Sequence, residues 1–200
     1  MSKQRQRLFQ PKLGYATAAC RKQWIESHDL NYDDPKVSSD MVSLEASLNV
    51  SEPLYFWQLY SLIGHQPVLD IVQNFYERVF DDHEAPWFRD VFVRIGGIEY
   101  HVSAQAAYWV DAMGGGKLYH GGNVRVQFHH QHNARKVMTL AGAERWMHHM
   151  RGALDEYDFS RFNDPRIKLC ILEFLRSRMK VYADQHGWKF DEKAFTDSAN

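Results

Sequence analysis

The spacing of hydrophobic residues predicts helices along most of the chain after residue 50. In the clearest stripe, apolar residues recur every three or four positions: Val68, Ile71, Val72, Phe75, Tyr76 and Val79. This spacing gives an α-helix one apolar face that can pack on a core. Nowhere do apolar and polar residues alternate over a stretch long enough to predict a β-strand. The pattern therefore predicts an all-α domain.

Helix-start and helix-stop residues divide the rest of the chain. Ser51-Glu52-Pro53 is typical of a helix start, Gly114-Gly115-Gly116 of a helix end, and Asn163-Asp164-Pro165 of the start of a last long helix. Further helices are expected at about 12–28, 99–113 and from 141. The predicted parts are an N-terminal extension with one helix and a linker at 1–50, a helical domain at 51–185 and a polar C-terminal tail at 186–200.

Composition narrows the class of protein. The chain has 200 residues and a net charge of −1, so no basic surface for nucleic acid is predicted. Its two cysteines, Cys20 and Cys170, do not make a disulfide framework. No apolar run approaches the roughly 18 residues of a membrane span, and the N-terminus lacks the apolar core of a secretory signal. These features predict a soluble, cytoplasmic protein and leave its oligomeric state open.

Histidines cluster in the stretch Phe128-His129-His130-Gln131-His132. Neutral imidazole is the commonest metal ligand, so clustering alone also allows a haem-free helical protein that binds zinc or no metal. Two residues on the predicted helix 99–113 sharpen the interpretation. His101 and Gln105 are one turn apart on a face beside the apolar ridge. Polar side chains in that position need solvent or a bound ligand.

Five motifs, in this order along the chain, resemble group II of the truncated haemoglobins. They are Asn-Phe-Tyr-Glu-Arg-Val at 74–79, Gly-Gly-Gly-Lys-Leu-Tyr at 114–119, His132, Ala-Glu-Arg-Trp-Met at 143–147 and Asp-Pro-Arg-Ile-Lys at 164–168. The resemblance covers about 52–183. It implies a two-over-two helical sandwich around a non-covalent, b-type haem that binds O₂, NO and CO.

The resemblance also implies which residues surround the haem. The ligand-binding distal pocket would consist of Tyr76, His101, Gln105 and Trp146, and the rest of the haem pocket of Phe88, Phe92, Tyr119 and Phe128. His132 would be the proximal iron ligand, because it follows Tyr119 by the family's interval (132 − 119 = 13). The interval to Trp146 (146 − 132 = 14) is one residue longer than is usual in the family. His129 and His130 are expected to face solvent or the haem propionates.

A pocket with several hydrogen-bond donors predicts slow ligand release, because each net bond contributes about 0.5–1.5 kcal/mol. Slow release is more suitable for a protein that keeps O₂ bound than for a carrier that must unload it. The alternative is a haem enzyme that oxidises NO or acts as a peroxidase, for which no catalytic residue is assigned. It would need an external reductase, because no domain for NAD(P)H or flavin is recognisable. His101 is expected to be a donor or a gate, with the iron five-coordinate or water-ligated.

Overall fold

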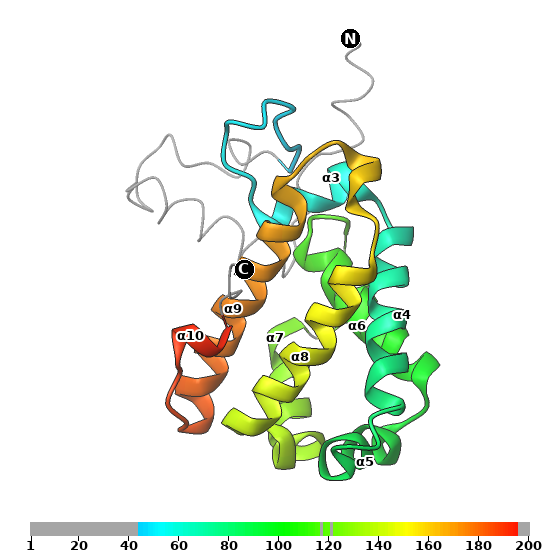
Figure 1. Cartoon of the computed structure of the whole chain (residues 1–200), viewed down its shortest axis with the longest axis vertical. Helices are drawn as coiled ribbons and strands as arrows, with labels where there is room; N and C mark the ends of the chain where they lie inside the picture. Colours follow the sequence, from blue (N-terminus) through cyan, green and yellow to red (C-terminus); the bar gives the residue numbers. More distant parts are fainter. Residues whose placement is uncertain (1–43, 117, 121, 196–200) are drawn as a thin grey trace.

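The computed structural model describes residues 44–116, 118–120 and 122–195 (Figure 1). The helix predicted at 12–28 lies outside the described residues. Within them every regular element is a helix, which confirms the all-α prediction. The α-helices are α3 (Leu59–Ile63), α4 (Gln66–Phe80), α5 (Pro86–Ile95), α6 (Ile98–Ala112), α7 (Gly122–Phe128), α8 (Leu140–Glu156), α9 (Arg166–His186) and α10 (Glu192–Phe195). Short helical turns are η2 (Phe56–Gln58), η3 (His129–Asn133), η4 (Arg135–Val137) and η5 (Phe159–Phe162).

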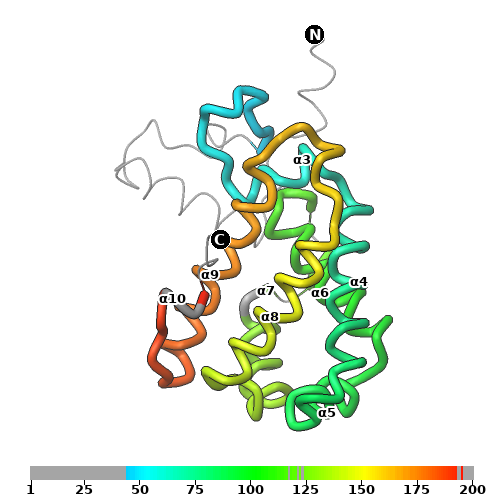
Figure 2. The backbone as a smooth tube through the Cα atoms, in the orientation of Figure 1, coloured from blue at the N-terminus to red at the C-terminus, as the bar shows by residue number. Residues whose placement is uncertain are grey.

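Two pairs of helices build the core. Helix α4 packs most extensively on α6 and on α8, and α8 contacts α9. In Figure 1 and Figure 2, α4, α8 and α9 run along the length of the molecule, and α5 closes its lower end. The predicted stripe of α4 is buried in this core, with Val68, Phe75 and Val79 fully covered. None of the helices in the described residues is long and apolar enough to cross a membrane.

The triple glycine ends α6 as predicted. Gly114 has a φ of +88°, a left-handed conformation that residues with a Cβ rarely adopt. A Cβ at this position would also collide with the carbonyl oxygen of Trp57. Gly114 therefore allows the chain to turn at the end of α6. Because it has no side chain, Gly114 can also lie directly against the backbone of Trp57.

The segment after α7 is a π-helix, η3, and not a continuation of the α-helix. Its defining bond runs from the Ala134 N–H to the carbonyl oxygen of His129, at 3.0 Å. A π-turn contains one residue more than an α-turn, so it is a place where an extra residue fits into a helix. The one additional residue between His132 and Trp146 is consistent with this, because η3 lies at the start of that interval.

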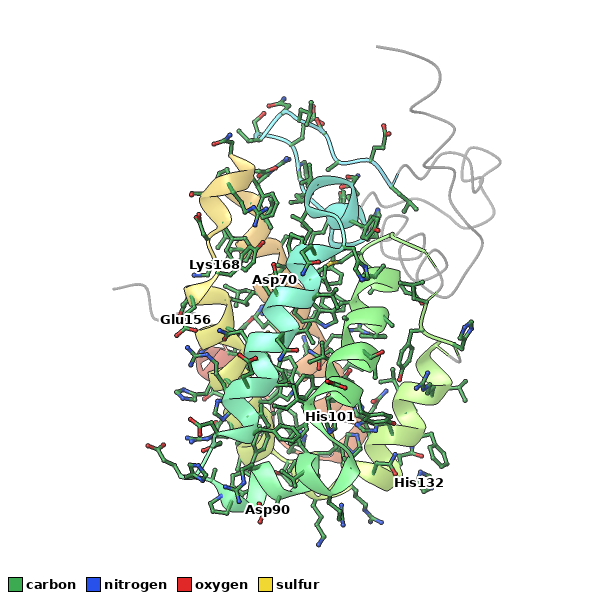
Figure 3. The ribbon with its side chains drawn as sticks, turned by 90° about the vertical axis from the view of Figure 1, so that its right-hand side faces the viewer. Asp70, Asp90, His101, His132, Glu156 and Lys168 are labelled. Carbon is green, nitrogen blue, oxygen red and sulfur yellow. The ribbon has the colours of Figure 1, made fainter. Side chains whose placement is uncertain are left out.

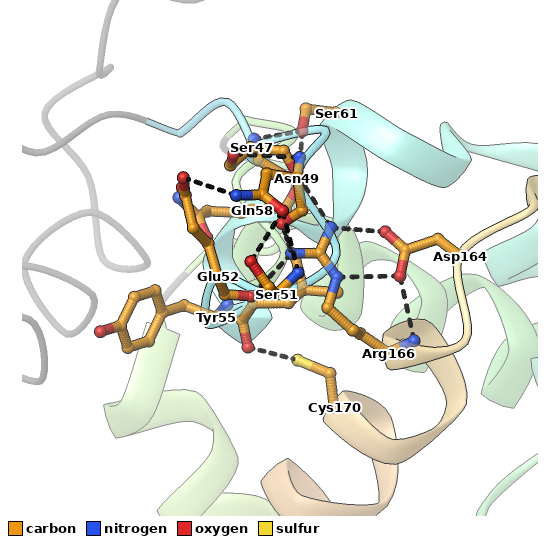
Figure 4. A network of polar contacts seen from close by, with 12 residues as sticks. Ser47, Asn49, Ser51, Glu52, Tyr55, Gln58, Ser61, Asp164, Arg166 and Cys170 are labelled. Carbon is orange, nitrogen blue, oxygen red and sulfur yellow. Dashed lines mark hydrogen bonds and ion pairs between the residues drawn. The ribbon is translucent and has the colours of Figure 1, made fainter.

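Arg166, at the start of α9, ties the segment before η2 to the domain (Figure 4). Its guanidinium donates to both carboxylate oxygens of Asp164, at 2.9 and 2.6 Å. It also donates to the carbonyl oxygens of Ser47 (2.8 Å), Asn49 (3.1 Å) and Glu52 (2.8 Å). The guanidinium holds the pKa of Asp164 below its ordinary value. The five N–H groups of this one side chain are thus all used, two in bonds to the nearby Asp164 and three in bonds to carbonyl groups far away in the sequence.

We expect Arg166→Lys to lower the free energy of unfolding by about 2–3 kcal/mol, measured by urea denaturation. A lysine ammonium has three donors and lacks the planar fork, so bonds to carbonyl groups are lost. Arg176→Lys is the matched control, because Arg176 pairs only with exposed carboxylates, those of Glu173 on the same helix and Glu192 on α10. Such a pair contributes about 0–1 kcal/mol. Equal losses in the two variants would contradict the proposed importance of Arg166.

Candidate functional site

A cavity of about 280 Å³ lies among α4, α5, α6, the segment from α7 to η4, α8 and α9. Most of its wall is aromatic or aliphatic. The structure brings eight of the nine predicted site residues to this wall: Tyr76, Phe88, Phe92, His101, Gln105, Tyr119, Phe128 and Trp146. The ninth, His132, does not line it.

Gln105 presents an unused hydrogen-bond donor in the cavity. The hydroxyl of Tyr76, buried on α4, donates to Gln105 Oε1 at 2.7 Å. Burial raises the pKa of Tyr76, so the hydroxyl keeps its proton and remains a donor. Because Oε1 accepts this bond, the orientation of the amide is fixed. Gln105 Nε2 is buried and has no hydrogen-bond partner among the described residues.

His101 is turned towards the backbone of α5. Its Nε2 lies 3.0 Å from the carbonyl oxygen of Phe92, and its ring stacks on Tyr76 with centroids 4.9 Å apart. Burial lowers the pKa of His101, although the contact with the Phe92 carbonyl opposes this shift. The neutral ring therefore donates from Nε2 to Phe92. This bond ties α6 to the C-terminal end of α5, so Nε2 is not available to a ligand in this arrangement.

His132 lies at the edge of the molecule, whereas His101 lies in its interior (Figure 3). The His132 ring is exposed and stacks on Phe128, with centroids 4.2 Å apart and planes at 18°. Its Nδ1 lies 3.0 Å from the carbonyl oxygen of Phe128. The interval counted from Tyr119 thus identifies a histidine that this structure does not bring to the cavity.

His129 and His130 are the histidines of this segment that line the cavity, contrary to the solvent-facing alternative expected for them. Burial lowers the pKa of His129, and the nearby charge of Arg125 lowers it further. Burial lowers the pKa of His130 to about 3, and its ring meets Tyr182 edge-on at 4.6 Å. Both imidazoles are neutral near pH 7, which is the form that binds a metal.

Charge in the cavity is of one sign. The guanidinium groups of Arg125 and Arg178 line it, and no Asp or Glu does so among the described residues. Haem is a flat, apolar ring system with two carboxylates and an iron. The aromatic wall, the neutral imidazoles and the arginines are the groups that such a molecule needs, so the residues present fit haem. In the described part of the chain, no three or more His, Cys, Asp or Glu side chains are grouped so that they could hold a metal ion by themselves.

Asp111 holds Tyr119 at the cavity, a role that the sequence did not indicate. This buried carboxylate on α6 accepts the backbone N–H of Leu118 at 2.5 Å and that of Tyr119 at 2.8 Å. The two bonds fold the chain after the triple glycine back onto α6. Tyr119 then packs edge-on against Tyr108, with ring centroids 5.6 Å apart.

Asp82 joins three helices beside the cavity. Arg145 donates to its two oxygens at 2.7 and 2.5 Å, and His149 Nε2 lies 2.7 Å from Oδ2. Asp82 Oδ1 also accepts the backbone N–H of Ala85 at 3.1 Å, at the start of α5. Arg145 and His149 flank Trp146 on α8. The cluster therefore fixes the position of Trp146, whose ring lies 4.8 Å from Phe75. Sequence reasoning missed Asp82 and His149; their only signal was the one-turn spacing of Arg145 and His149.

Helices paired two over two around an aromatic, histidine-bearing cavity define a globin-type haem pocket. Residues 58–181 match the model of the bacterial-like globin family, and the chain belongs to that family. It is 33% identical over 118 residues to two-on-two hemoglobin-3 of Arabidopsis thaliana, a match that covers 59% of this chain and 64% of that protein. Group 2 truncated hemoglobin 3-1 of Lotus japonicus is also 33% identical over 118 residues, covering 59% of this chain and 67% of the relative. The chain thus spans about two thirds of these relatives. They confirm its resemblance to group II truncated haemoglobins.

Asp82→Asn should lower the free energy of unfolding at pH 7 by about 3 kcal/mol, because it leaves Arg145 without its buried counter-charge. Arg145 holds the pKa of Asp82 well below its ordinary value. Its stabilising contribution is therefore present above the ordinary carboxyl pKa of about 4 and is lost as the pH falls below it. The difference between the wild-type protein and the variant, measured by urea denaturation, should shrink below about pH 4.

The control for this change is Asp81→Asn, since Asp81 is the exposed neighbour of Asp82 and lies 3.4 Å from an exposed His83. We expect a loss of at most about 1 kcal/mol there. A loss in Asp82→Asn that is equally small would show that the cluster does not hold α8 in place.

Proposed function

We propose that this protein binds haem in the cavity and, through it, O₂ and related diatomic ligands such as NO and CO. The single observation that carries the proposal is the buried Gln105 Nε2. This nitrogen has no hydrogen-bond partner among the described residues and shares the cavity with two neutral imidazoles. A buried donor without an acceptor costs about 1–3 kcal/mol. A ligand that accepts this hydrogen bond removes the cost.

Haem, when bound, supplies an iron with a coordination position for a diatomic gas. The residues of this chain determine how firmly the gas is held. Gln105 donates to it from Nε2, and Tyr76 orients the amide of Gln105 by donating to its oxygen. Trp146 provides an indole N–H from α8. His101 keeps α6 and α5 together through the Phe92 carbonyl and thereby limits the movement of the Gln105 wall.

For the iron ligand, the cavity wall favours His129. Its ring lines the cavity. The side-chain nitrogen of Asn133, a donor, lies 3.5 Å from its Nδ1, so this contact has to be released before Nδ1 carries the ring proton and Nε2 can bind the metal. His132 is the competing candidate. Its Nδ1 donates to the carbonyl oxygen of Phe128, so the ring proton is on Nδ1 and Nε2 is free to bind a metal. For His132 to bind iron, the π-helix would have to turn so that the exposed ring enters the cavity.

An alanine series separates the candidates. We expect His129→Ala to lose haem or to release it to apomyoglobin at least tenfold faster than the wild-type protein, followed by absorbance in the visible region. His132→Ala should keep its haem, because its ring is exposed. His130→Ala tests the remaining histidine of the wall. Haem loss in His132→Ala with retention in His129→Ala would move the iron ligand to His132.

The donor role of Gln105 predicts faster O₂ release on its removal. Gln105→Leu should accelerate O₂ dissociation roughly fivefold or more, the effect of a hydrogen bond of about 1 kcal/mol. Tyr76→Phe should have a smaller effect, because it frees the amide of Gln105 to rotate and leaves the donor in place. Stopped-flow kinetics measure both rates. Tyr60→Phe, a tyrosine outside the cavity, is the control, and an unchanged rate in Gln105→Leu would rule out this donor.

A further inference from the structure

Buried nitrogen atoms without a hydrogen-bond partner gather on a second wall of the cavity. Besides Gln105 Nε2, they include His130 Nδ1, Arg178 Nε and Trp188 Nε1, none of which has a partner among the described residues. All of these side chains line the cavity. Globular proteins leave few buried polar atoms unsatisfied. Their concentration around one space therefore indicates that a ligand supplies the missing acceptors.

Three of these residues belong to the α9 side. Arg178 lies on α9, one turn before Tyr182, and Trp188 directly follows Gly187, the C-cap of that helix. His130 reaches the same place from η3, with its ring 4.6 Å from Tyr182. The positive charge of Arg178 also acts on Tyr182, where it opposes the rise in pKa caused by burial. Arg178 and His130 are thus both neighbours of Tyr182.

The other arginines near α9 show how unusual Arg178 is. Arg166 is bound to Asp164, and Arg176, two residues before Arg178, pairs with Glu173. Arg125, the other guanidinium of the cavity, lies 4.5 Å over the Tyr119 ring and donates to a backbone carbonyl at 3.4 Å. Arg178, by contrast, makes no hydrogen bond or ion pair within the described part of the chain, and its guanidinium lies 5.7 Å from the Phe174 ring.

The chemistry of these groups selects an anion. Arginine is always protonated and only donates, and the indole N–H of tryptophan also only donates. The neutral ring of His130 can carry its proton on Nδ1. Because no carboxylate lines the cavity among the described residues, the acceptor must come from the ligand. A planar carboxylate or oxoanion matches a guanidinium best.

We propose that Arg178, His130 and Trp188 form an oxyanion-binding subsite on the α9 wall, separate from the Gln105 wall. It takes a carboxylate or a small oxoanion of the nitrate type. Two sources supply this chemistry: a propionate of haem, or a free anion that enters the cavity beside it. The propionate source rests on the proposed function, whereas the free-anion source does not.

The first arm of the test follows the thermal unfolding of the full-length, haem-free chain as nitrate replaces chloride at constant ionic strength. Binding to the native state raises Tm with nitrate concentration until it saturates. We expect this rise in the wild-type protein and its loss in Arg178→Met. Arg176→Met is the matched control: its Tm is lower, but the rise with nitrate remains.

The second arm compares the binding of haem with that of haem dimethyl ester, which lacks the two carboxylates, by absorbance titration. If a propionate occupies the subsite, the wild-type protein prefers haem by tenfold or more, and Arg178→Met loses this preference while Arg176→Met keeps it. Loss of the nitrate response alone identifies a free oxoanion, and loss of the haem preference alone identifies a propionate.

Trp188→Phe keeps an aromatic ring, smaller than the indole, and removes the N–H, so it tests the subsite if Arg178→Met does not fold. It should weaken the nitrate response or the haem preference at least threefold. If Arg178→Met and Trp188→Phe leave both properties unchanged, the subsite is overturned. If the wild-type protein fails to bind haem, the proposed function fails, but the nitrate arm still decides the subsite.

Discussion

The carboxylate of Asp82 is the contact on which the geometry of the cavity depends. It binds Arg145 and His149 of α8 and, through Ala85, the first turn of α5. Its side chain is 1% exposed, so its charge is compensated almost entirely by these partners. Helix α5 carries Phe88 and Phe92 to the cavity, and α8 carries Trp146. Three of the cavity's aromatic residues therefore take their positions from helices that meet at one anionic group.

The cavity combines a stable frame with walls that are not satisfied by the protein itself. Around Asp82 and Asp111, every carboxylate oxygen accepts at least one hydrogen bond. Inside the cavity, by contrast, Gln105 and Arg178 have buried donors without acceptors among the described residues. Such donors lower the stability of the unliganded fold. A ligand that accepts hydrogen bonds from these donors therefore stabilises the folded domain, because binding and folding are linked.

The fold and most of the cavity could be predicted from the sequence because they depend on short intervals. The apolar stripe of α4 and the one-turn spacing of His101 and Gln105 both follow from helical periodicity. The position of His132 could not be predicted this way. The interval from Tyr119 identifies one residue, but it does not fix which side of the helix carries that residue, because the π-helix changes the number of residues per turn within the histidine segment itself. The choice between His129 and His132 therefore depends on tertiary structure.

Contacts between residues far apart in the sequence could not be predicted for a different reason. Asp82 and Arg145 are separated by 63 positions, and neither lies in a pattern that predicts a partner. A single Asp after a helix is usually a solvated helix end. Arg178 likewise follows the polar periodicity of α9, and only the tertiary structure shows that its Nε is buried and that its side chain lines the cavity.

The Arg166 network has a consequence for where a stable fragment of this protein can begin. The network crosses the boundary predicted at residue 50, because two of its acceptors are the carbonyl groups of Ser47 and Asn49. Further upstream, Leu44 is buried against Trp57. A fragment that begins at Ser51 would lack the carbonyl groups of Ser47 and Asn49, while the guanidinium of Arg166 that they bind would remain on α9. An expression fragment that retains the whole contact must therefore start before Leu44, inside the segment that the helical pattern assigns to the extension.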